Sequence, residues 1–159
     1  MATLAQLANS ERVALLLGAT NTKGVVSWAD QIIEQMDRPP IELIDISMGG
    51  SKPINSFVAL IGLLAEKTDD IPSTMHGFGR LTDLVRQRTL NAVTAIERCY
   101  SHLRSEDLLY SEPFMIFHNL RTDLAMVEDG YFGKDKLPEI EADLLAELDE
   151  MSRQAWTVG

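Results

Sequence analysis

Apolar residues recur every three or four positions along most of this 159-residue chain, which is the spacing of one face of an α-helix. The residues from Val25 to Met36 show this pattern most clearly, with polar side chains at the positions between. No segment is left over that reads convincingly as a strand. The sequence therefore predicts an all-α protein, a single-domain bundle of six or seven helices over residues 1–159 with no significant sheet.

Two predicted helices define the centre of this bundle. The residues from Ile54 to Lys67 are apolar on nearly every side, and such a helix belongs in the middle of a bundle. A long neighbouring helix is predicted over Arg80–Leu103, with its apolar face weakened at Arg88 and Thr89. An opening helix is predicted to stop near Gly18.

The segment DRPPIELIDIS predicts a short helix, because its two prolines fit only in a first helical turn. A strand would place Asp45 on the same face as Leu43, whereas a helix separates them. The apolar side of this helix is expected to hold Ile41, Ile44 and Met48. Gly49 and Gly50 are expected to end it. The stretch from Trp28 to Ser47, which contains this segment, resembles parts of bacterial helical proteins, and the resemblance implies no chemistry.

The last third of the chain predicts two further amphipathic helices. The apolar face of the first holds Phe117, Leu120, Leu124 and Val127 and closes at Gly130. The second covers approximately residues 137–155 and is acidic away from its apolar face. That apolar face holds Leu137, Ile140, Leu144, Leu148 and Met151.

The negative charge of the chain is concentrated in this last third. Residues 106–159 carry 13 Asp/Glu against four Lys/Arg, a net charge of −9 out of a total of −10. Such a field disfavours nucleic acid and anionic membranes as partners and favours a basic protein. The residues expected to bind a protein partner are Glu147, Asp149, Glu150 and Trp156. The alternative is a solvated face that keeps the protein in solution.

One glycine-rich segment, His76-Gly77-Phe78-Gly79-Arg80, is predicted to be a loop leading into a helix. Backbone N–H groups at such a helix start can hold an anion, and an arginine can add a bidentate contact. His76, Gly77, Gly79 and Arg80 are therefore the predicted ligand-binding residues. The alternative is that the glycines only permit a turn between packed helices.

No metal or cofactor is predicted. Cys99 and His102 have a spacing that could ligate zinc on a helix, but a structural zinc site needs four ligands and the chain has one cysteine. Cys99 is instead expected to pack as a small hydrophobe. A single cysteine fits a reducing compartment, and the N-terminus lacks the features of a secretory signal. A cytoplasmic location without a membrane span is therefore expected.

No catalytic constellation is recognised, which favours a function other than catalysis. His118 and Asp123 could act as acid and base only if the fold brought them together. Five arginines between Arg80 and Arg104 form no continuous stripe, and pairing with the acidic last third explains them equally well. The sequence favours a small protein-binding module of the adaptor, inhibitor or immunity type. The alternatives are a helical ligand-binding or enzymatic domain that uses the His76–Arg80 segment, and a structural homo-oligomer.

Overall fold

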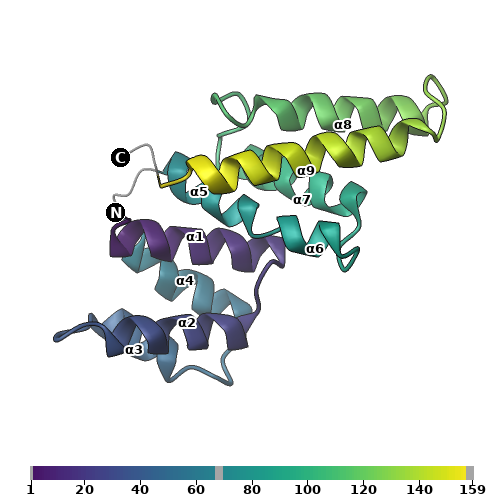
Figure 1. The fold of residues 1–159 in the computed structure, drawn as a ribbon. Coiled ribbons are helices and arrows are strands. Elements are labelled where there is room, and N and C mark those ends of the chain that lie inside the picture. The colour runs from purple at the N-terminus through teal and green to yellow at the C-terminus, as the bar shows by residue number, and fades with distance from the viewer. Residues whose placement is uncertain (1, 67–69, 157–159) are drawn as a thin grey trace. The chain divides into compact units, whose positions relative to one another are not determined.

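The computed structural model describes residues 2–66 and 70–156, and the regular elements among these residues are all helices (Figure 1). They are α1 (Leu4–Leu17), α2 (Thr22–Glu34), α3 (Ile41–Ser47), α4 (Ile54–Leu64), α5 (Asp70–Gly79), α6 (Thr82–Arg86), α7 (Ala92–Ser105), α8 (Met115–Glu128) and α9 (Lys136–Gln154). The all-α class is confirmed, although the helices outnumber the six or seven predicted. Among the described residues, none of these helices has the length and apolarity needed to cross a membrane.

Local hydrogen bonds fix the ends of the first helices. At the start of α1, the Thr3 hydroxyl accepts a hydrogen bond from the Gln6 N–H at 3.1 Å, and the Gln6 side chain accepts one from the Thr3 N–H at 2.9 Å. The helix ends at Gly18, whose φ of 78° is left-handed, as the sequence predicts. Asn21 caps α2 by accepting the Gly24 N–H at 2.8 Å.

The prediction of one long helix over Arg80–Leu103 is wrong. Its residues form the short helix α6 and the longer helix α7, separated by residues 87–91. The chain turns at Arg88, which has a left-handed φ of 60°. Asn91 then caps α7 by accepting the Val93 N–H at 2.7 Å. The break was hard to predict, because arginine is not a residue type that normally supplies a left-handed turn.

The described residues form two compact units. Unit 1 comprises the chain up to Gly77 together with Ala155 and Trp156, and unit 2 runs from Phe78 to Gln154. The chain therefore passes from unit 1 to unit 2 within α5 and returns just after α9. Two compact units still form a single domain if they unfold together. The predicted single domain therefore stays a prediction, and it can be tested by measuring the cooperativity of unfolding.

Unit 1 is built from α1 to α4 and the part of α5 up to Gly77. Within it, α1 packs on α4, while α3 packs on both α2 and α4. Its core consists of Ala8, Leu15, Val25, Ala29, Leu43, Ile46, Phe57 and Ile61. Trp28, Ile32 and Met36 pack against this core, so the predicted apolar face of α2 is confirmed.

The prediction for the inner side of α3 is wrong. Leu43 and Ile46 are the side chains that α3 buries, whereas Ile41 is 63% exposed and Met48, which follows the helix, is 80% exposed. The helix has only seven residues and is apolar on two sides, so periodicity could not decide which side packs inward.

Helix α4 is also less enclosed than predicted. Phe57 and Ile61 are fully buried, but Leu63 on the other side of the helix is 58% exposed. Because α4 meets its neighbours α1 and α3 along one side, an apolar composition all round does not place it at the centre of a bundle.

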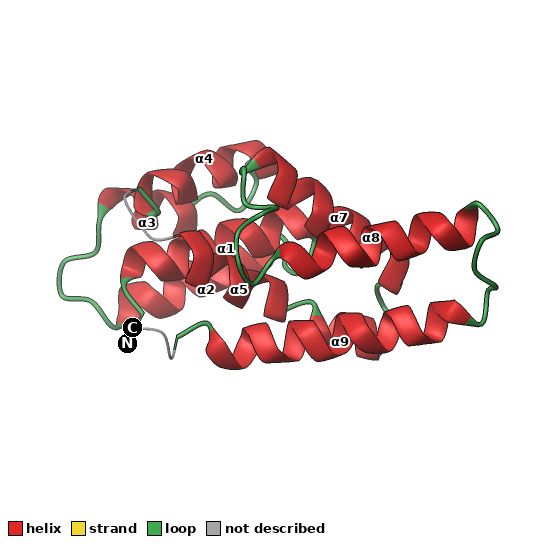
Figure 2. Ribbon diagram, turned by 90° about the horizontal axis from the view of Figure 1, so that it is seen from above, coloured by secondary structure: helices red, strands yellow, loops and turns green. Residues whose placement is uncertain are grey.

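Unit 2 contains α6 to α9, with α8 and α9 forming an antiparallel hairpin joined by residues 129–135 (Figure 2). An aromatic cluster lies in its core, where the ring centroid of Phe78 is 5.3 Å from that of Phe117 and 5.6 Å from that of Phe114. Buried side chains from the two predicted apolar faces complete this core. They are Phe117, Leu120 and Leu124 of α8, and Ile140, Leu144, Leu148 and Met151 of α9.

If the chain is a single domain, unfolding in urea will give the same midpoint by two probes. Both tryptophans, Trp28 and Trp156, belong to unit 1, so their fluorescence reports that unit. Far-UV circular dichroism reports the helices of both units. Coincident transitions are expected for one cooperative domain. Two separated midpoints would show that the units unfold independently.

Candidate functional site

The segment predicted to be a glycine-rich loop is helical. His76, Gly77 and Gly79 lie in the last turns of α5, and Arg80 lies in the turn between α5 and α6. The loop prediction is therefore wrong, because the helix that starts at Asp70 continues through the glycines. N–H groups within an α-helix donate to carbonyls of the preceding turn. Anion binding by this segment stays a prediction, although the loop that suggested it is a helix.

The two glycines allow close approach of helix backbones. A Cβ atom placed on Gly77 would lie 2.7 Å from Cγ1 of Val13 on α1, inside unit 1. A Cβ atom on Gly79 would lie 2.7 Å from Cβ of Ser152 on α9, inside unit 2. Both distances are shorter than a real side chain tolerates. The distances therefore support the alternative that these glycines serve the packing of helices.

His76 is half-buried and takes part in the polar contacts between α1 and α5. Its Nδ1 atom is hydrogen bonded to the hydroxyl of Ser10 at 2.6 Å, and its ring centroid is 4.8 Å from that of half-buried Trp156. A serine next to a histidine is the arrangement of an activated nucleophile. Ser10, however, is only 2% exposed. A substrate cannot reach its hydroxyl, so the pair joins two helices.

The acidic residues predicted to bind a partner are partly engaged inside the chain. Asp149 forms an ion pair with Arg86 at 3.7 Å, and Glu150 pairs with Arg153 and accepts a hydrogen bond from Gln154. Glu147 forms no ion pair with the residues that the structure describes. These acids belong to unit 2, whereas Trp156 belongs to unit 1. The predicted pairing of arginines with the acidic last third is present at Arg86.

Cys99 and His102 are both buried in unit 2. Burial raises the pKa of the Cys99 thiol far above its usual range, because the thiolate would lose its hydration. Within residues 2–66 and 70–156, no three His, Cys, Asp or Glu side chains gather closely enough to hold a metal ion. Cys99 packs as a small hydrophobe.

Unit 2 also contains a partly open cavity of about 260 Å³, here named the Arg88 cavity. Most of its lining residues are apolar ones from α6 to α9, but nearly half of its surface is polar, and Arg88, Asn91 and Glu141 are its polar side chains. The apolar lining consists of Val85, Leu90, Ala92, Val93, Ile96, Leu124, Leu137 and Ile140. Sequence reasoning missed this site, because residues from three separated stretches meet there and no spacing rule joins them.

The backbone at Arg88 is unusual. The Arg88 N–H donates to the Val85 carbonyl at 3.1 Å, and the Leu90 N–H donates to the Leu84 carbonyl at 3.1 Å, which closes the end of α6. Glycine is the residue that normally takes the left-handed position in such a turn. Here an arginine occupies it and lines the cavity. The weakened apolar face at Arg88 and Thr89 was the one sequence signal near this site.

Comparison of the chain with protein-family models, with curated proteins and with solved structures finds no match.

Replacing Gly77 by alanine is expected to destabilise the protein by roughly 1–3 kcal/mol, because the new methyl group would overlap Val13. Gly62 of α4 provides the matched control, since a Cβ atom there meets nothing within 4 Å. Gly62→Ala is expected to stabilise the protein by up to about 1 kcal/mol through helix propensity. Urea denaturation measures both changes, and equal effects would contradict the close approach at Gly77.

Replacing Arg88 by glycine is expected to stabilise the protein by about 1 kcal/mol, because glycine adopts the left-handed conformation without steric cost. Arg88→Ala removes the same side chain but keeps a Cβ atom, so no stabilisation is expected from it. Thermal and urea unfolding of the two variants separate the backbone effect from the side-chain effect. A gain in the alanine variant as large as that in the glycine variant would contradict this account.

Proposed function

We propose that this chain is a small cytoplasmic protein-binding module of the adaptor, inhibitor or immunity type. The observation that carries the proposal is the outer face of α3, formed by Ile41, Met48 and half-buried Ile44. Large exposed apolar side chains that are grouped on one face mark interaction surfaces in water-exposed proteins. The chain has a single cysteine, which fits the reducing environment of the cytoplasm.

The outer face of α3 is held rigidly. Ile41 and Met48 are two helical turns apart and so project in nearly the same direction. Leu43 and Ile46, on the opposite side, anchor the helix in the core of unit 1. An apolar face presented by a packed helix loses little conformational freedom when a partner binds, and this favours recognition.

The segment of the chain that contains this face has a net negative charge. Residues 30–66 carry six Asp/Glu against two Lys/Arg, a net charge of −4. Asp37 is exposed, and Glu42 and Asp45 lie half-buried on α3 itself. The matching partner is an amphipathic helix of another protein, with an apolar stripe flanked by lysine and arginine.

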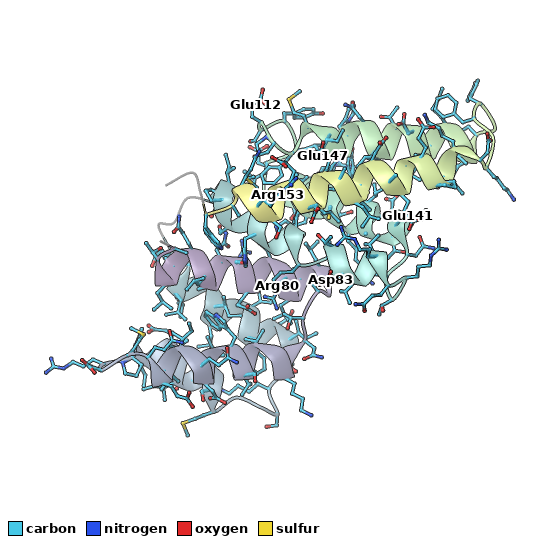
Figure 3. The ribbon with its side chains drawn as sticks, viewed as in Figure 1. Arg80, Asp83, Glu112, Glu141, Glu147 and Arg153 are labelled. Atoms are coloured by element: carbon cyan, nitrogen blue, oxygen red, sulfur yellow. The ribbon has the colours of Figure 1, made fainter. Side chains whose placement is uncertain are left out.

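The acidic side of α9 supports the same type of partner. Figure 3 labels Glu141 and Glu147 on different sides of this helix, so these two carboxylates do not share one patch. Diffuse negative charge of this kind accelerates the encounter with a basic protein more than it holds the complex together. The predicted residues Glu147, Asp149 and Glu150 are therefore proposed to assist association, with the outer face of α3 supplying affinity. Trp156 carries no charge and is half-buried against His76, so it has no part in this step.

A synthetic amphipathic peptide with leucine and lysine at helical spacing tests this proposal by fluorescence anisotropy. At about 150 mM salt, where surface charges are screened beyond ~8 Å, the wild-type protein is expected to bind it. The double variant Ile41→Ser/Met48→Ser is expected to bind at least about tenfold more weakly, because two apolar contacts are lost. Both side chains are exposed, so stability is expected to stay unchanged.

Two controls make the test specific. Tyr131→Ser removes another highly exposed apolar side chain, from unit 2, and is expected to leave binding unchanged. A peptide with glutamate in place of lysine is expected not to bind. Equal binding of the lysine peptide by the wild type and the double variant would overturn the proposal. Sedimentation of a wild-type dimer that the double variant loses would also overturn it, since a second copy would then be the occupant.

A further inference from the structure

We propose that the Arg88 cavity binds a small zwitterion with an apolar body, of the class of an α-amino acid with an apolar side chain. This site lies in unit 2 and goes beyond the protein-binding function proposed for α3 in unit 1. The cavity has a mixed polar and apolar surface, and side chains of opposite charge, Arg88 and Glu141, both line it.

The cavity is partly open to solvent, where Arg88 and Asn91 are exposed, and its inner wall lies against the core of unit 2. Val85, Ile96, Leu124 and Ile140 line it and are themselves buried, so its wall is held by the same packing that holds the helices together. Small-molecule sites are concave and mostly apolar, with a few polar groups that fix orientation. A volume of about 260 Å³ suits a ligand smaller than a typical drug molecule.

The positive side of the cavity comes from the exposed side chain of Arg88, with a smaller contribution from the start of α7, where the Val93 N–H already donates to Asn91. Ala92 and Val93, the first residues of this fourteen-residue helix, both line the cavity. A helix start carries partial positive charge, and a guanidinium group binds a carboxylate with two parallel hydrogen bonds. The left-handed backbone at Arg88 places an arginine where glycine would terminate the helix more easily. A carboxylate is the ligand group that fits this side.

The negative side comes from Glu141 of α9. Among the described residues, neither Arg88 nor Glu141 forms an ion pair, although both line the same cavity. A simple anion would be repelled by Glu141, and a simple cation by Arg88. A ligand that carries both a carboxylate and an ammonium group satisfies both charges, while its apolar part fills the cavity.

Isothermal titration with three probes of similar shape tests this inference. L-Leucine carries both charged groups, 4-methylpentanoate lacks the ammonium group, and 3-methylbutylamine lacks the carboxylate. L-Leucine is expected to bind at least about tenfold more tightly than either analogue, because each analogue leaves one charge of the site without its partner. Glycine, which lacks the apolar body, is expected to bind more weakly than L-leucine.

Two variants assign the charged groups. Arg88→Gln is expected to reduce the affinity for L-leucine to that for 3-methylbutylamine, because the ligand carboxylate then has no guanidinium group to bind. Glu141→Gln is expected to reduce it to that for 4-methylpentanoate. Arg104→Gln and Glu128→Gln remove exposed charges that do not line the cavity and are expected to leave binding unchanged.

Three results would overturn the inference. They are no heat from L-leucine at concentrations up to about 10 mM, equal affinity for L-leucine and 4-methylpentanoate, or L-leucine binding that survives both Arg88→Gln and Glu141→Gln. Circular dichroism of each variant confirms that the fold is kept. Binding of the lysine-rich peptide to α3 is a separate measurement, so either proposal can fail without the other.

Discussion

Helix α5 lies closer to its neighbours in each unit than side chains at two of its positions would allow. Gly77 brings the backbone of α5 against α1 in unit 1, and Gly79 brings its last residues against α9 in unit 2. A helix interior is a costly place for glycine, and at these two positions a side chain would not fit. The hydrogen bond between Ser10 and His76 then fixes α5 along α1.

Much of the fold could be predicted from periodicity, and the failures have a common physical cause. The apolar faces of α2, α8 and α9 were predicted correctly because each helix is long enough to show one dominant stripe. The inner side of α3 was not, since a seven-residue helix samples too few positions. The break between α6 and α7 depends on one backbone angle at Arg88, which composition does not reveal.

The candidate sites were harder to predict than the helices. Glycines that suggested an anion-binding loop turned out to serve helix packing, because the same residue type permits both a loop and a close approach. The Arg88 cavity combines residues 85–96 with Leu124 and with residues 137–141, and only the folded chain brings these together. Part of the acidity of α9 is balanced internally, as Asp149 shows with Arg86. Net charge alone therefore overstates the surface that a partner meets.

The burial of Cys99 has a practical consequence for experiments on this chain. It is the only thiol in the sequence, and its surroundings disfavour the thiolate that reacts with maleimides. A cysteine introduced at an exposed position such as Ala59 on α4 would therefore be the first to react. Fluorescent or spin labels can thus be attached at one chosen position while the native cysteine stays in place.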